Sequence, residues 1–391
     1  MNKVFLDHAS TTPVDQSVFN EMKKYFLEEF ANPSSIHQGG QNASRAIKIA
    51  RNKIKEFISA DNEQEIIFCS SGTEADNLAV KGVAMALKDK GNHIITSKIE
   101  HPAVLESCKF LEKDLGFDIS YLDVNENGFI DLAELENSIN SDTILISIMM
   151  ANNEIGTIEP ISEIGDIAKK HNVYFHSDAV QAAGKIEIDV NELNVDLLSL
   201  SAHKINGPKG IGVLYVKSGT KLTPQMSGGS QENHRRSSTE NVPAIVGMGK
   251  AIELTQKNLK ESKSKLKYLR DKLISGIEKN IDEVKLNGPR HKKRLINNVN
   301  FEFKHIDGEA ILLNLDLNGI AASSGSACAS GAIEPSHVLL ATGLKKELAK
   351  SSIRFTLGYD TTEEDIDYVI DILPEIIQKL RDMSPELSER F

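Results

Sequence analysis

Two polar side chains stand where runs of apolar residues end, and both could do chemistry. Lys204 closes the segment SerAlaHisLys (201–204), and Asp178 opens the segment AspAlaValGln (178–181). Each segment follows an apolar run that predicts a strand. Desolvation of an ammonium group at such a place lowers its pKa and suits the amine to Schiff-base chemistry. Taken alone, Lys204 has a plainer interpretation, a lysine whose stem packs on the strand while its amine reaches solvent.

A third polar segment has the composition of a phosphate-binding turn. SerSerGlyThrGluAlaAspAsn (70–77) follows a predicted strand and opens a predicted helix, so backbone N–H groups near Gly72 and Thr73 could bind an anion. Taken alone, it is also an ordinary helix N-cap. With Lys204 and Asp178 it meets the needs of pyridoxal 5'-phosphate (PLP): an amine for the Schiff base, an acid for the pyridine nitrogen, and a phosphate cradle.

A histidine is placed to assist such a cofactor. His101 lies in IleGluHisProAlaVal, just after the predicted strand 93–97. It could stack on the cofactor ring and exchange protons near neutral pH. Without the other residues it would be an ordinary capping or surface residue.

The chain has three cysteines, an odd and sparse set without a CxxC pair, which excludes a disulfide framework and a cysteine metal site. Cys69 falls in a predicted strand and Cys108 in a predicted helix, so both are expected to be inert core thiols. Cys328 lies among Ala, Ser and Gly residues (321–331), a composition typical of a mobile loop or of close approach to another surface. It is either an exposed, reactive thiol or a small buried residue.

Short apolar runs alternate with helical periods from about residue 63 to 217, a rhythm that predicts βαβ units. Several of the runs are apolar on both faces, which is typical of strands covered by helices on both sides. The sequence therefore predicts an α/β fold with a mostly parallel sheet. The expected strands are 65–69, 93–97, 118–122, 143–149, 173–176, 195–199 and 212–216.

A Gly/Ser-rich stretch (226–241) and a long helix (242–281) interrupt this rhythm. They are followed by an α+β pattern with strands at 298–303 and 353–357, a helix over 308–317 and a final helix from residue 362. For 391 residues we expect two domains. These are a large α/β domain (16–255) and a smaller α+β domain (1–15 and 256–391).

Composition and charge narrow the possible ligands and cellular location of the protein. The chain has 45 Lys and Arg against 56 Asp and Glu, a net charge of −11, and 40% hydrophobic residues. Such a field disfavours direct nucleic-acid binding. The sequence shows neither a signal peptide nor a long apolar span, so we expect a cytoplasmic protein.

Two other motifs are expected to have structural rather than ligand-binding roles. Residues 123–134 match the calcium-loop pattern, but the preceding residues alternate as a strand, so we expect a strand-to-helix turn. The basic segments 257–272 and 290–294 are expected to be a solvated helix face and a loop, the alternative being a docking surface for an acidic protein.

With these residues in view, the sequence resembles the cysteine desulfurases of the nitrogen-fixation and iron–sulfur-assembly type, within class V of the fold-type-I PLP enzymes. The resemblance spans almost the whole chain. It rests on motifs in order: LeuAspHisAlaSerThrThrPro (6–13), AsnProSerSerIleHis (32–37), GluHisProAlaVal (100–104), AlaAsnAsnGluIleGlyThr (151–157), HisSerAspAlaValGln (176–181), SerAlaHisLysIleAsnGlyProLysGlyIleGly (201–212), ThrGluAsnValPro (239–243), SerSerGlySerAlaCys (323–328), GluProSerHisValLeu (334–339) and SerSerIleArgPheThrLeuGly (351–358).

The resemblance implies roles for matching residues. Lys204 would bind PLP as a Schiff base, Asp178 would pair with the pyridine nitrogen, and His101 would lie over the ring. The remaining implied contacts are Gln181 to the ring hydroxyl, Gly72, Thr73, Ser201 and His203 to the phosphate, Thr239 from the second subunit of a homodimer, Asn153 to both cofactor and substrate, and Arg354 to the substrate.

The same resemblance implies the reaction. L-Cysteine would become L-alanine, and its sulfur would pass to Cys328 as a persulfide. The long loop before GluProSerHisVal is similar to that of family members whose mobile cysteine passes sulfur to separate acceptors, such as an iron–sulfur scaffold or a tRNA-thiolating enzyme.

The sequence departs from the family at five positions near the phosphate and the dimer contact. The family usually has Gly at Ser71, Ser230 and Ser238, and Arg-Gly or a close variant at Asn233 and His234. If the backbone at Ser238 needs a positive φ, a serine strains it and puts the Thr239 contact in doubt.

Two other functions compete with the desulfurase. A selenocysteine lyase or another class-V aminotransferase or lyase would use the same cofactor residues, but an aminotransferase has no need of Cys328. A non-catalytic sulfur-transfer scaffold would leave the cofactor residues without a purpose.

Overall fold

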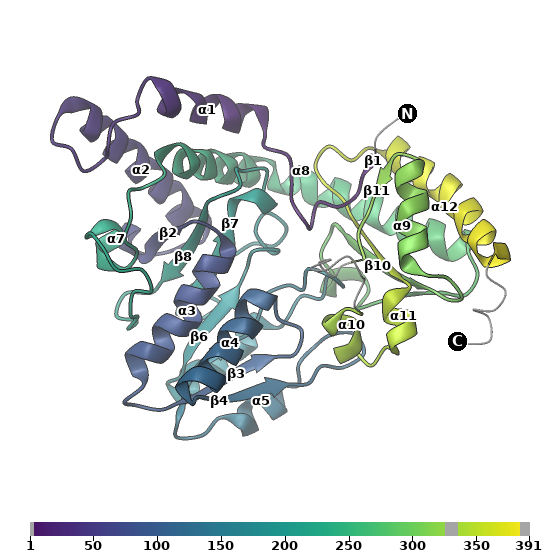
Figure 1. Ribbon diagram of the computed structural model, residues 1–391, viewed down its shortest axis with the longest axis horizontal. Helices are drawn as coiled ribbons and strands as arrows, with labels where there is room; N and C mark the ends of the chain where they lie inside the picture. Colours follow the sequence, from purple (N-terminus) through teal and green to yellow (C-terminus); the bar gives the residue numbers. More distant parts are fainter. Residues whose placement is uncertain (1–3, 325–334, 384–391) are drawn as a thin grey trace.

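The computed structural model describes residues 4–324 and 335–383, and its largest sheet has seven strands (Figure 1). Within this sheet only β8 runs antiparallel to its neighbours, which confirms the mostly parallel α/β fold. The spatial order is β2 (Ile66–Cys69), β8 (Gly212–Val216), β7 (Leu197–Ser201), β6 (Tyr174–Asp178), β5 (Thr143–Ser147), β3 (His93–Ser97) and β4 (Asp118–Leu122).

Within the seven-stranded sheet, the carboxyl ends of three strands differ from the sequence prediction, and the starts of β2, β6 and β7 lie one or two residues later than predicted. β5 ends at Ser147, although Ile148 and Met149 beyond it are equally buried. β6 and β7 each run two residues further than predicted, to Asp178 and Ser201. In β5, burial extends past the hydrogen-bonded ladder. In β6 and β7, the ladder continues through buried polar residues, among them Ser177, Asp178 and Ser201, so an apolar run underestimates the length of the strand.

Helices cover both faces of this sheet, as predicted from its doubly apolar strands. On one face, α3 (Gly72–Leu87) and α4 (Pro102–Leu115) share a buried core with Ile67 and Cys69. On the other, Ile66 and Phe68 face a second core. That core includes residues of α1 (Gln16–Leu27), α2 (Gln38–Phe57), α5 (Leu132–Ser138), α6 (Ile161–His171) and the first half of α8 (Val242–Asn280).

A separate buried core lies around an antiparallel sheet of three strands, drawn on the right of Figure 1. β1 (Val4–Phe5) pairs with β11 (Ile320–Ala321), so the N-terminal residues join this core. The sheet order is β12 (Ser352–Thr356), β10 (Asn298–Phe303) and β9 (Val284–Leu286), with α9 (Gly308–Leu317) and α12 (Glu363–Met383) packed beside it. The short helices α10 (His337–Ala341) and α11 (Lys346–Lys350) lie between β11 and β12 in the sequence.

Helix α8 belongs to both cores. Ile252 packs in the large-sheet core and Leu266 in the other, so the two cores meet along one continuous helix. The domain division at residue 255 lies between them and stays a prediction. In the basic segment 257–272, Lys263 pairs with Glu187 as a solvated face predicts, but Arg270 is 1% exposed and donates to the Arg294 and Leu295 carbonyl oxygens. Arg294 of the segment 290–294 is also 1% exposed, so these two arginines are buried rather than solvated. None of the helices in the described part of the chain has the length and apolar character of a membrane-spanning helix.

The calcium-like segment is a strand-to-helix turn, as predicted. It connects β4 to α5, and the Asn125 side chain accepts backbone hydrogen bonds from Asn127 (2.9 Å) and Phe129 (3.2 Å). Asp131 caps the start of α5. The side-chain oxygens of Asn125 and Asp131 therefore stabilise the local turn and helix.

Candidate active site

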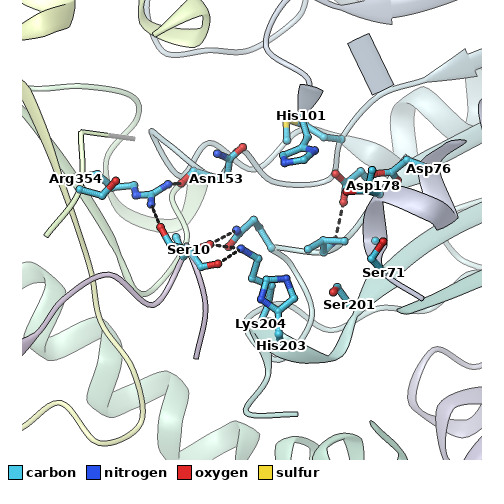
Figure 2. A pocket seen from close by; sticks show the side chains of 17 residues that line it. Ser10, Ser71, Asp76, His101, Asn153, Asp178, Ser201, His203, Lys204 and Arg354 are labelled. Atoms are coloured by element: carbon cyan, nitrogen blue, oxygen red, sulfur yellow. Dashed lines mark hydrogen bonds between the residues drawn. The ribbon is translucent and has the colours of Figure 1, made fainter. Parts of the chain in front are cut away.

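A cavity of about 410 Å³ lies beyond the ends of β6 and β7 and beside the start of α3 (Figure 2). It brings together most of the residues that the sequence singled out: Gly72, Thr73, His101, Asn153, Asp178, Gln181, Ser201, His203, Lys204 and Arg354. The cavity is also lined by residues without a predicted role in it: Ala9, Ser10, Ser71, Asp76, Met149, Val180 and Ser323.

Lys204 ends the short 3₁₀ turn η2 (Ala202–Lys204), directly after β7. Its Nζ donates to the carbonyl oxygens of Ala9 and, at 2.7 Å, Ser10. Burial, with Arg354 and Lys185 nearby, lowers the pKa of the Lys204 amine to about 7. A substantial fraction of the amine is therefore neutral at neutral pH, as nucleophilic and proton-accepting roles require.

Asp178 is the last residue of β6 and is 5% exposed. One carboxylate oxygen accepts a hydrogen bond from the backbone N–H of Val180 at 2.8 Å. Burial raises the pKa of Asp178, while His101 and Lys204 oppose that shift. The carboxylate is thus ready to be stabilised by a cationic partner in the cavity.

His101 both caps a helix and faces the cavity, so the two interpretations of this residue are compatible. Its Nδ1 accepts from the backbone N–H of Ala103 at 3.1 Å at the start of α4. That bond assigns the proton of the neutral ring to Nε2. Burial lowers the pKa of His101, which favours the neutral ring.

The start of α3 has the features of a phosphate cradle. A Cβ on Gly72 would lie 2.9 Å from the Val180 side chain, so a larger residue here would displace that side chain. The nearby Ser201 hydroxyl is buried without a hydrogen-bond partner. The departure at Ser71 causes no strain, because its backbone is extended (φ −168°) and its hydroxyl caps the helix. Burial first, and then Lys204, lowers the pKa of His203 to about 4.

Arg354 lies on the opposite side of the cavity. It donates to the Asn153 carbonyl oxygen (3.0 Å), to Asp7 (3.0 Å) and to the Ser10 hydroxyl (2.8 Å), while its Nε is buried without a partner. These bonds fix the guanidinium plane, and a fixed fork with a donor to spare suits a carboxylate. Gln181 donates to the Ala9 carbonyl oxygen (2.9 Å), so its amide is oriented by the N-terminal segment.

The two cysteines that the structure describes agree with the prediction of inert core thiols. Cys69 and Cys108 are buried and free, and burial raises the pKa of Cys108 to about 12 and that of Cys69 as well. Both are inert thiols. Cys328 lies outside the described residues. On its N-terminal side, Ser323 exchanges backbone hydrogen bonds with Arg354, and on its C-terminal side His337 donates to the Glu100 carbonyl oxygen (3.0 Å).

Thr239 does not line this cavity. It lines a separate hollow with Ser238, Glu232 and Arg236. The backbone at Ser238 has φ 113°, so this serine occupies the strained conformation that the departure from glycine predicted. Ser230 has φ −87° and carries no such strain.

A buried lysine and an aspartate on successive strand ends, together with a phosphate cradle in this α/β sheet, define a PLP enzyme of fold type I. The chain belongs to the family Aminotransferase class-V, whose sequence profile matches residues 4–369. It is 56% identical over 387 residues to Cysteine desulfurase IscS of Dictyoglomus turgidum, covering 99% of this chain and 98% of that protein. It is 53% identical over 382 residues to Cysteine desulfurase IscS of Methanosarcina thermophila, covering 98% and 94%. A solved structure described as a NifS-like protein is 37% identical and superposes with a TM-score of 0.91, covering 97% of this chain and 100% of that one.

Proposed function

We propose that this chain converts L-cysteine to L-alanine with PLP and passes the sulfur through Cys328 to acceptor proteins. The observation that carries the proposal is the convergence of Lys204, Asp178 and Arg354 on one cavity. The chain is also 53–56% identical, over nearly its whole length, to proteins named cysteine desulfurase. The activity is that of a PLP-dependent cysteine desulfurase, an enzyme of the sulfurtransferase class.

Different residues of the cavity would bind different parts of the cofactor. PLP, when bound, supplies an electron sink that acidifies the substrate α-proton and weakens the carbon–sulfur bond. Lys204 would bind the cofactor and, once released, accept the α-proton, as its lowered pKa allows. Asp178 would pair with the pyridine nitrogen. Gln181 would contact the ring hydroxyl, and the phosphate would lie among Gly72, Thr73, Ser201 and His203.

The substrate would bind at the wall of the cavity opposite Asp178. Arg354 and Asn153 would hold the cysteine carboxylate and orient the amino acid. The Cys328 thiolate would attack the substrate sulfur, so that an S–S bond forms as the carbon–sulfur bond breaks. The carbon then gains a proton and leaves as alanine. The Nε2 of His101 would move protons between these groups.

A homodimer would complete the site, with Thr239 of one subunit reaching the phosphate in the other. An exposed apolar group supports this contact: Phe26, Leu27, Phe30 and Ile36 at the end of α1 and in the connection to α2 are 57–92% exposed. The same connection lines a surface hollow with the loop that precedes Thr239. The chain should therefore elute at twice 43.0 kDa in light-scattering chromatography. The cytoplasmic location stays a prediction.

The test is an assay for alanine and sulfide from L-cysteine in the presence of a thiol reductant. Cys328→Ser should lose both products, whereas the matched control Cys108→Ser should keep them if it folds. An aminotransferase would be indifferent to Cys328→Ser. A selenocysteine lyase would accept only the selenium substrate, and a scaffold would produce no alanine. Any of these results would overturn the proposal.

A further inference from the structure

A second carboxyl group lines the cavity beside Asp178 and has no role in the reaction described so far. Asp76 lies in α3, four residues after Gly72 and so on the same helix face. It is 1% exposed, and its Oδ1 has no hydrogen-bond partner. Figure 2 shows the Asp76 and Asp178 side chains next to each other at one end of the cavity.

Nothing described nearby neutralises both carboxyl groups. Among the described residues, neither Asp76 nor Asp178 has a lysine or arginine within ion-pair distance. The cation candidate nearest to Asp76 is His176, whose Nε2 is 3.6 Å from Oδ1. The nitrogens of His176 are hydrogen-bonded to the Ser147 (2.9 Å) and Ser199 (3.0 Å) hydroxyls, and burial lowers the pKa of His176 to about 3. This histidine is therefore neutral, and two adjacent buried carboxyl groups cannot both ionise at low cost.

The surroundings decide which acid keeps the proton. Asp178 receives the Val180 N–H and lies in the field of His101 and Lys204, all of which favour its ionised form. Asp76 instead faces the negative field of the Asp178 carboxylate. Burial first, and then this charge, raises the pKa of Asp76 well above its usual value, while the Ser199 hydroxyl opposes the shift.

We propose that Asp76 is a positioning residue that keeps its proton, so that Asp178 is the ionised member of the pair when it meets the cofactor nitrogen. The inference rests on the proposed role of Asp178 in binding PLP. It adds that the charge at this end of the cavity is set by two acids rather than by one.

The direct test is infrared spectroscopy of the PLP-free protein with ¹³C-labelled aspartate, which keeps the buried glutamates out of the signal. At pH 8 the wild type should show the carbonyl band of a protonated aspartic acid, and Asp76→Asn should lose it. A wild type without the band, or a band that persists in Asp76→Asn, would overturn the proposal. If Asp76→Asn does not fold, Asp178→Asn takes its place, and loss of the band in that variant would show that Asp178 rather than Asp76 carries the proton.

PLP affinity of the cofactor-free protein separates this proposal from the proposed function. Asparagine imitates a protonated aspartic acid, so Asp76→Asn should bind PLP within about threefold of wild type, whereas Asp178→Asn should bind it about 10–100-fold more weakly. If Asp178→Asn binds PLP normally, the role of Asp178 is wrong. If Asp76→Asn loses as much affinity as Asp178→Asn, Asp76 is the ionised acid and the present inference is wrong.

Discussion

The active-site cavity and the loop that precedes Thr239 are built from backbone of opposite character. In the cavity, Asp178 ends a regular strand, and Ser71 and Ser201 have extended backbone. In the loop, Glu232, Asn233, His234 and Ser238 all have positive φ values, between 47° and 113°. Strand ends and helix starts thus place these cavity residues without strain, whereas the loop needs other support.

Ion pairs supply that support. Arg51 binds both carboxylate oxygens of Glu232 at 2.8 Å, and Glu232 also accepts from the backbone N–H of Phe68 at 2.9 Å. Arg236 pairs with Glu74 in the first turn of α3 at 2.8 Å. The strained loop is therefore tied to the same helix start that we propose to hold the phosphate. The fold therefore specifies the backbone of the cavity, whereas a few side chains specify that of the loop.

The largest effect is expected where the cavity binds substrate. Arg354→Met removes the guanidinium fork and should lower kcat/KM for L-cysteine at least about 100-fold, since each charge-assisted hydrogen bond is worth about 1.5–3 kcal/mol. Arg354→Lys should recover part of the loss, mainly in KM. Steady-state kinetics on folded, PLP-loaded variants measures both. Unchanged kinetics in Arg354→Met would mean that the substrate binds elsewhere.

A smaller effect is expected at Glu100, a buried acid next to His101 in the sequence. Burial raises the pKa of Glu100 to about 8. The folded state then binds more protons than the unfolded state between about pH 4.5 and 8, so this group makes stability fall as pH rises through that window. Glu100→Gln should remove this fall, a change on the order of 1–3 kcal/mol between pH 5 and pH 8.5.

Urea unfolding at the two pH values measures the Glu100 effect. Glu106→Gln is the matched control in the neighbouring helix, because the Glu106 side chain is 67% exposed. An equal pH dependence in the wild type and Glu100→Gln would show that Glu100 is not a buried acid.

The smallest effect tests the strained loop. Ser238→Gly should raise the free energy of unfolding by about 1 kcal/mol, because glycine adopts φ 113° without strain. The matched control Ser230→Gly, where φ is −87°, should give no gain. Equal changes in the free energy of unfolding for the two variants, measured with denaturant, would show that the backbone at Ser238 is not strained.

Much of the site could be predicted because strand ends can be read from apolar runs. Lys204, Asp178 and Gly72 each follow such a run, and the fold brings them to one cavity. Asp76 shares a helix face with Gly72, but periodicity alone does not reveal that its carboxyl group is buried beside another acid. The positive φ of Glu232 was equally hidden, because long-range contacts with Arg51 hold it. Cys328 lies outside the described residues, and its role stays a prediction.

The proposed function depends most directly on Lys204, which we expect to be the lysine that binds the cofactor. Borohydride reduction of the PLP-loaded protein, followed by peptide mass mapping, would fix the cofactor to its lysine. The expected result is a pyridoxyl group on Lys204 alone. Lys185 is the sharpest internal control, since burial lowers the pKa of its amine to about 8 and it lines a small cavity together with Lys204. A pyridoxyl group on Lys185, or on any other lysine in place of Lys204, would contradict the claim.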